Sequence, residues 1–176
     1  MGNLDKTIAF FKELNFKPNV DHFQDKLVIQ KTVCLLELSG VELGYEFSLY
    51  VRGPYSPALT SDLYSKKEIV DKLKTSTKLS ESETSILHKI FELTNHLEPT
   101  MLEIISTYAF LLKVLKQSEK EALINLKKLK PFFSESKIAL GVSRANELFF
   151  RATEQDMKEM KQEFEVWQNV SLEDQK

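Results

Sequence analysis

One segment constrains the fold more than any other: residues 100–116 are apolar on nearly all sides. The apolar positions are too closely spaced to share a single helical face: Leu102, Ile104, Ile105, Tyr108, Phe110, Leu111, Leu112, Val114 and Leu115. A helix that is hydrophobic all round must be covered by other elements on every side. The sequence therefore predicts a packed helical domain with this segment at its centre.

Helix start signals and apolar residues at steps of three and four predict further helices around this centre. Asp21 is expected to cap the second helix, because Gln24 follows three residues later, and Ser118 with Glu121 forms a capping-box pattern. Ser134 is expected to cap the helix after Pro131. The expected helices cover about residues 4–15, 22–40, 57–63, 66–73, 81–97, 100–116, 119–130, 134–148 and 153–170, the last one starting at Thr153 with Asp156.

The 176 residues are enough for one domain with its own core. We expect a single domain over 1–176, with a charged stretch near 72–82 as its most plausible seam. The three helices within 100–148 have the lengths and short connections of a helix-turn-helix unit.

The helical rhythm breaks once, at residues 45–63. Here Tyr45, Phe47, Leu49 and Val51 alternate with polar neighbours or Tyr50, which predicts a half-buried strand. Gly53-Pro54 then breaks the strand, and Ser56-Pro57 is a strong start signal for a helix. The predicted fold class is therefore mainly α, a multi-helix domain with a small strand–turn–helix insert and the helix-turn-helix-like unit towards the C-terminus.

Cysteine usage and the N-terminal residues bear on the compartment. The single Cys34 lies in an apolar run and cannot form an intramolecular disulfide, which is typical of a reduced, cytoplasmic protein. The first residues lack the basic-then-apolar order of a signal peptide, and no apolar run of about 18 residues predicts a membrane span.

Known catalytic and metal-binding patterns do not stand out. His22, His88 and His96 lack metal-ligand spacing, and Cys34 is expected to be a buried core residue. The few glycines are too far apart for a phosphate loop. We therefore expect a non-enzymatic protein that holds no metal or cofactor.

The turn of the insert is the predicted partner-binding site, formed by Tyr50, Arg52, Gly53, Pro54, Tyr55 and Ser56. Tyrosine and arginine are the residue types that dominate interface energies. The start of the next helix beside them offers free amides and a positive end, which suit an anion or a peptide carboxylate. The alternative is that Gly53-Pro54 only reverses the chain and that the rings pack on the helices.

A second functional hypothesis is DNA binding through the helix-turn-helix-like unit. Its candidate contacts are Lys127, Lys128, Lys130, Lys137 and Arg144, with 134–148 as the recognition helix. The formal net charge of −2 gives no general field for nucleic acid, and acidic residues are interspersed among these cations. A solvated helix face is the alternative explanation.

The sequence also resembles a family. Lys26-Leu27 onwards, the run Tyr50-Val51-Arg52-Gly53-Pro54-Tyr55-Ser56 and the later Leu129-Lys130-Pro131 are similar to the pattern of the poorly characterised YwgA-like family, which is related to Panacea (SocA-like antitoxin) domains. This resemblance implies no enzymatic activity. It implies protein binding of an antitoxin-like or adaptor-like kind, in which the partner is a toxin or a client delivered to a protease.

Overall fold

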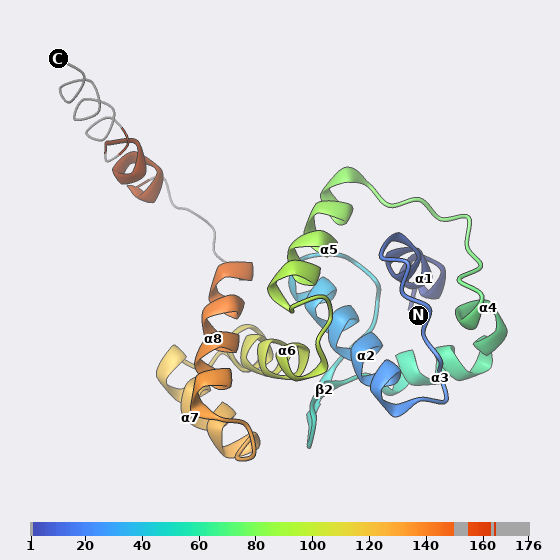
Figure 1. The fold of residues 1–176 in the computed structure, drawn as a ribbon, viewed down its shortest axis with the longest axis horizontal. Helices are drawn as coiled ribbons and strands as arrows, with labels where there is room; N and C mark the ends of the chain where they lie inside the picture. The colour runs from blue at the N-terminus through green and yellow to red at the C-terminus, as the bar shows by residue number, and fades with distance from the viewer. Residues whose placement is uncertain (1, 150–154, 163, 165–176) are drawn as a thin grey trace.

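The computed structural model describes residues 2–149, 155–162 and 164, and its fold is mainly α, as predicted (Figure 1). The elements in chain order are α1 (Leu4–Glu13), α2 (Phe23–Leu38), β1 (Ser48–Tyr50), β2 (Gly53–Tyr55), α3 (Pro57–Ser65), α4 (Lys67–Asp71), α5 (Glu81–Leu93), α6 (Pro99–Lys113), α7 (Glu119–Leu129) and α8 (Glu135–Phe149). The predicted helix 153–170 begins and ends outside the described residues, and residues 155–162 within it are helical.

Helices α2 and α6 form the centre of the fold. Every residue from 27 to 36 in α2 and from 101 to 111 in α6 is buried, which confirms the prediction for most of the apolar run. The end of the run was predicted wrongly, since α6 ends at Lys113 and the side chains of Val114 and Leu115 are 45% and 46% exposed. In Figure 1, α7 and α8 lie on one side of this centre, and α1, α3 and α4 lie on the other. The strand β2 lies against α2 and α6, and β1 pairs with β2.

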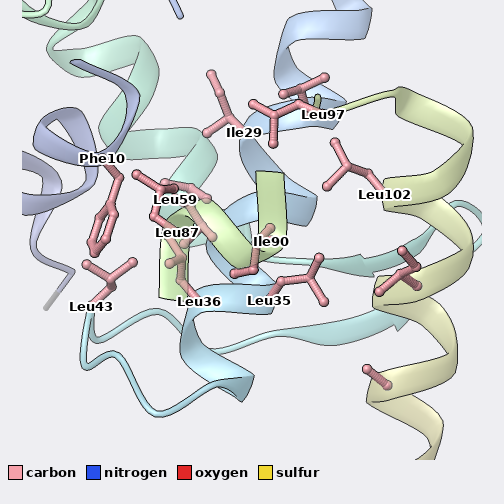
Figure 2. Close-up of a cluster of buried hydrophobic side chains, with 14 of the residues drawn as sticks. Phe10, Ile29, Leu35, Leu36, Leu43, Leu59, Leu87, Ile90, Leu97 and Leu102 are labelled. Carbon is pink, nitrogen blue, oxygen red and sulfur yellow. The ribbon is translucent and has the colours of Figure 1, made fainter. Parts of the chain in front are cut away.

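The core is built mainly from aliphatic side chains that several helices contribute, together with aromatic rings such as that of Phe10 (Figure 2). Leu36 from α2, Leu59 from α3 and Leu87 from α5 are completely buried beside Ile90. Burial of one such side chain stabilises the fold by roughly 1.5–3 kcal/mol. Because Leu59 and Leu87 come from opposite sides of the 72–82 stretch, that stretch connects two halves of one hydrophobic cluster.

Most predicted helix starts are confirmed by the side chains that cap them. The side chains of Ser80 and Ser118 accept from the amides of Glu83 and Glu121, each at 3.3 Å, and both glutamates complete a capping box. Ser134 likewise accepts from a backbone amide at the start of α8, at 3.4 Å. Local start signals therefore fix these boundaries.

Two helix predictions are wrong. Asp21 does not cap α2: His22 is at the N-cap position without a side-chain cap, and the Asp21 carboxylate lies 3.2 Å from the ammonium of Lys67. Helix α5 ends at Leu93, because residues 95–97 have positive φ angles of 53°, 60° and 63°. Leu97 is still buried. The spacing of the apolar residues therefore predicted correctly that Leu97 belongs to the core, but wrongly that it lies in a helix.

The insert is a hairpin followed by a helix, which corrects the prediction of one strand over 45–52. The strand β1 is only three residues long, and Gly53-Pro54 begins a second strand that pairs antiparallel with it. Leu49 faces Pro54, and Tyr50 faces Gly53. The expected inward position of Val51 is also wrong, since this side chain is 87% exposed at the tip of the hairpin.

Helix α8 packs directly on α6 at Gly141. A Cβ atom on Gly141 would lie only 2.3 Å from Cγ2 of Ile104, so the absence of a side chain allows the two helices to approach. Glycine is unfavourable within a helix compared with alanine, and here it is required by the packing of α8 on α6. In the described part of the chain, no helix is long and apolar enough to cross a membrane.

Candidate functional site

The hairpin is attached to α2 through a buried glutamine. The Gln30 side-chain amide donates to the Ser56 carbonyl at 2.9 Å and accepts from the Ser56 amide, also at 2.9 Å. The same amide group donates to the hydroxyl of Thr60 in α3. These bonds fix the junction between β2 and α3, where the Ser56 hydroxyl also caps α3 as predicted.

Gly53 lets the hairpin lie directly on α6. Its φ is +92°, and a Cβ atom there would lie 2.3 Å from Oγ1 of Thr107. Glycine accepts this left-handed conformation without steric cost, whereas a larger residue would be strained and would also collide with α6. The strand β2 is thereby held against the buried centre of the fold.

Two lysine ammonium groups bind backbone carbonyls of the hairpin. Lys31 Nζ donates to the Pro54 carbonyl at 2.7 Å, and Lys130 Nζ donates to the Val51 carbonyl at 3.4 Å. Lys130 also forms a buried ion pair with Glu103 of α6. Both lysines are almost fully buried, at 3% and 0% exposure, and they attach the hairpin to α2 and to the end of α7.

The local excess of positive charge affects these lysines. The pKa of Lys31 is lowered to about 8, mainly by burial. The nearby charges of Lys130 and Arg52 contribute to the lowering, while Cys34 and Glu103 act in the opposite direction. Burial also lowers the pKa of Lys130, and the Glu103 carboxylate partly offsets this. Lys31 and Lys130 therefore both interact with the carboxylate of Glu103, and Arg52 adds to the positive charge around them.

A cavity of about 530 Å³ opens between α2, the hairpin and α3. Its volume is in the range of small-ligand and side-chain pockets. Twelve residues line it: Phe23, Lys26, Leu27, Gln30 and Lys31 from α2; Tyr50, Val51, Arg52, Gly53 and Tyr55 from the hairpin; and Thr60 and Tyr64 from α3. We call this the hairpin pocket.

Aromatic rings form much of the wall of the hairpin pocket, and cations lie over two of them. The Tyr50 and Tyr55 rings meet edge to face, with centroids 5.3 Å apart. The Arg52 guanidinium lies 4.8 Å from the centroid of the Phe23 ring. Lys26 lies 5.5 Å from the Tyr64 ring centroid and donates to its hydroxyl at 2.8 Å. Such cation–π contacts are favourable but leave the charge unneutralised.

The hairpin pocket has no acidic residue in its lining. In the part of the chain that the structure describes, no carboxylate lies within 4.0 Å of the cationic nitrogens of Lys26, Lys31 or Arg52. Within these residues, three cations therefore face one cavity without an ion-pair partner. Such a site favours an anionic ligand.

The predicted partner-binding residues divide into two groups. Tyr50, Arg52, Gly53 and Tyr55 line the hairpin pocket, whereas Pro54 and Ser56 are buried beneath it and support its shape. Sequence reasoning missed the lining that α2 and α3 contribute. The available signal was Gln30-Lys31, two polar residues inside the apolar run 27–36.

The five residues of the DNA-binding hypothesis do not form a free basic surface. Lys130 is fully buried, Lys127 lies 3.0 Å from Glu135, and Arg144 donates to the Leu93 carbonyl at the end of α5, at 2.8 Å. Lys128 and Lys137 are exposed. Lys130 and Arg144 thus stabilise the fold itself.

The described residues contain no group of three or more histidine, cysteine or acidic side chains that could hold a metal ion. Cys34 is buried, as predicted, and burial raises the pKa of its thiol to about 12, which keeps it protonated and unreactive at neutral pH. The chemistry that the hairpin pocket offers is recognition through charge, rings and hydrogen bonds.

Comparison of the chain with protein-family models, curated proteins and solved structures gives no match. The likeness to the YwgA-like pattern therefore stays a prediction from the residues quoted for it.

Proposed function

We propose that this protein is a non-enzymatic protein-binding module and that the hairpin pocket is its contact surface. The observation that carries the proposal is the combination of Tyr50, Tyr55 and Arg52 around one cavity of about 530 Å³. Tyrosine and arginine contribute most strongly to binding when they lie at the centre of an interface. Both tyrosines belong to a hairpin that buried lysines hold in place, so little ordering has to accompany binding.

The resemblance to YwgA-like and Panacea proteins supports the same proposal. It covers the hairpin sequence, and it suggests an antitoxin-like or adaptor-like role in which the partner is a toxin or a protease client. The hairpin pocket would then be where that partner docks. A cytoplasmic setting agrees with the single buried cysteine.

The test is capture of partners from the source cells by three tagged proteins: wild type, Arg52→Ala/Tyr55→Ala, and Lys128→Ala. Lys128 is an exposed cation of α7 outside the hairpin pocket, so the third protein controls for loss of charge alone. We expect at least one protein that wild type and Lys128→Ala capture equally and that the double variant loses. That protein, purified, should bind wild type directly by calorimetry and bind the double variant at least tenfold more weakly.

Identical captured sets, from variants whose circular dichroism and melting match wild type, would rule out the hairpin pocket as the contact surface. Binding of the purified partner with equal affinity to wild type and to the double variant would rule it out as well.

DNA binding through α6–α8 is the alternative function, and its support is the three-helix arrangement alone. Titration of duplex DNA at low and at physiological salt tests it. A DNA-binding protein that neutralises several phosphates must lose affinity steeply with salt. Since Lys130 and Arg144 are used within the fold, we expect no salt-dependent binding.

A further inference from the structure

The hairpin pocket has a gradient of exposure among its cations. Arg52 is exposed at the mouth, Lys26 is partly buried, and Lys31 is only 3% exposed although its side chain still lines the cavity. Lys31 Nζ has three N–H donors, and among the described residues it has one hydrogen-bond acceptor, the Pro54 carbonyl. The Lys31 side chain therefore brings positive charge to the inner end of the cavity.

Apolar and aromatic surface lies between the cations. Phe23, Tyr50 and Tyr64 are each about half exposed, at 52%, 51% and 47%. Large aromatic side chains that stay this exposed around one cavity can bury much apolar area when a ligand covers them. The hairpin pocket thus combines a surface for an apolar group with charge for an anion.

The anion is best matched by a carboxylate. The Arg52 guanidinium lies over the Phe23 ring, and no carboxylate lies within 4.0 Å of it among the described residues. A guanidinium can donate to both oxygens of a carboxylate at once. Lys31, which lines the cavity from the α2 side, adds a second positive charge. The lining contains no acidic side chain, so Glu103, the carboxylate that acts on Lys31, lies outside it.

We infer that the hairpin pocket binds the C-terminal carboxylate of its partner together with an apolar or aromatic last side chain. This inference rests on the proposed function and names the part of the partner that docks. A chain end is favoured because it carries a carboxylate to a buried ammonium with a single strand of peptide entering the cavity. To place an internal Asp or Glu there, the peptide chain would have to enter the cavity and leave it again.

The test uses three short peptides and the full-length ¹⁵N-labelled protein in an NMR titration. The first is acetyl-Gly-Ser-Gly-Ser-Phe with a free C-terminal carboxylate, and the second is the same peptide with a C-terminal amide. The third is an amidated peptide that carries an internal Glu next to Phe. Together they separate a chain-end carboxylate from a side-chain carboxylate and from the ring alone.

We expect the free-carboxylate peptide to shift backbone signals of Lys31, Arg52, Gly53 and Tyr55 and to bind at least tenfold more tightly than the other two. Arg52→Gln should weaken this binding about tenfold, and Lys26→Gln should weaken it less, because Lys26 is engaged with Tyr64. Lys128→Gln, which removes an equal charge from α7, should leave it unchanged.

Equal affinity for the carboxylate and amide peptides would overturn the inference, and so would shifts confined to other surfaces or no shifts at millimolar peptide. Preference for the internal Glu peptide would overturn the chain-end assignment. If the peptides fail while Arg52→Ala/Tyr55→Ala still abolishes capture of a partner, only the inference is wrong. If Arg52→Ala/Tyr55→Ala also captures the same proteins as wild type, the proposed function is wrong too.

Discussion

At the residue scale, Gly53 combines a backbone requirement with a packing requirement. The two can be measured separately, because Gly40 has almost the same φ, +94°, but no atom lies within 4 Å of the place that a Cβ atom would take there. The difference between alanine substitutions at the two glycines therefore isolates the contact with Thr107.

We expect Gly40→Ala to cost about 1 kcal/mol of unfolding free energy, which is the strain of a left-handed alanine. Gly53→Ala should cost about 3 kcal/mol or more, because the new methyl group also meets Oγ1 of Thr107 at 2.3 Å. Urea unfolding of both variants measures these costs. In a Thr107→Ala background the extra cost of Gly53→Ala should shrink; an unchanged cost would show that the collision is not its cause.

Residue-scale reasoning from sequence succeeded where the signal was local. Ser118 and Ser134 cap their helices as predicted, since a cap depends only on residues three positions away. It failed at Asp21, whose carboxylate is drawn to Lys67, a residue distant in sequence. It also missed Lys31 as a site residue, because its bond to Pro54 spans 23 positions.

At the scale of elements, Gly141 determines how closely α8 approaches α6. Helix propensity alone favours alanine over glycine by about 1 kcal/mol within a helix. The contact with Ile104 opposes this, since the added methyl group would lie 2.3 Å from Cγ2 of Ile104. The two effects have opposite signs, so one substitution decides between them.

We expect Gly141→Ala to destabilise the protein by about 1–3 kcal/mol, as is usual when a packed interface is overfilled. Thermal and urea unfolding measure this change. Ala139→Gly, at an exposed position of the same helix, serves as the propensity control and should cost about 1 kcal/mol. A gain in stability for Gly141→Ala would mean that α8 is not packed on α6 in this way.

The hairpin shows why sequence patterns describe some elements better than others. The alternation of Tyr45, Phe47 and Leu49 correctly indicated which side chains face inward, and Ser56 correctly marked the start of α3. The strand β2 was missed because its position depends on distant groups. Lys31 of α2, for example, donates to the Pro54 carbonyl of β2 across 23 positions. The cavity was beyond prediction for the same reason, because α2 and α3 complete it.

At the scale of the whole molecule, the Glu103–Lys130 pair joins α6, the end of α7 and the hairpin. Removing one partner of a buried pair usually costs about 3–5 kcal/mol, whereas replacing both by apolar residues is often neutral or stabilising. We expect Glu103→Gln to cost about 3 kcal/mol and Glu103→Leu/Lys130→Met to recover most of that loss, as measured by urea unfolding. A double variant no more stable than Glu103→Gln would contradict this account.

The same double variant separates stability from positioning of the hairpin. Without Lys130 the Val51 carbonyl loses its donor, so the tip of the hairpin is held less firmly. We therefore expect the double variant to be stable and yet to bind the hairpin-pocket partner more weakly than wild type.

The last prediction concerns Lys31 and the dependence of stability on pH. Burial lowers its pKa in the folded protein to about 8, below its ordinary value of 10.5. Between these two values the unfolded chain holds more protons than the folded protein, so this lysine makes stability rise with pH there. Below about pH 8 both states hold the proton, and the cost of burying the charged amine is fully present.

The quantity to follow is the unfolding free energy of wild type minus that of Lys31→Met. We expect this difference to rise by about 2–3 kcal/mol from about pH 8 to 10.5, with a slope of up to about 1.4 kcal/mol per pH unit. Urea unfolding of both proteins at about pH 7, 8, 9 and 10 measures this, and groups that titrate equally in both cancel in the difference. A difference that stays flat with pH for Lys31→Met would mean that the Lys31 amine is as well solvated in the folded protein as in the unfolded chain, and the hairpin pocket would then lack its buried cation.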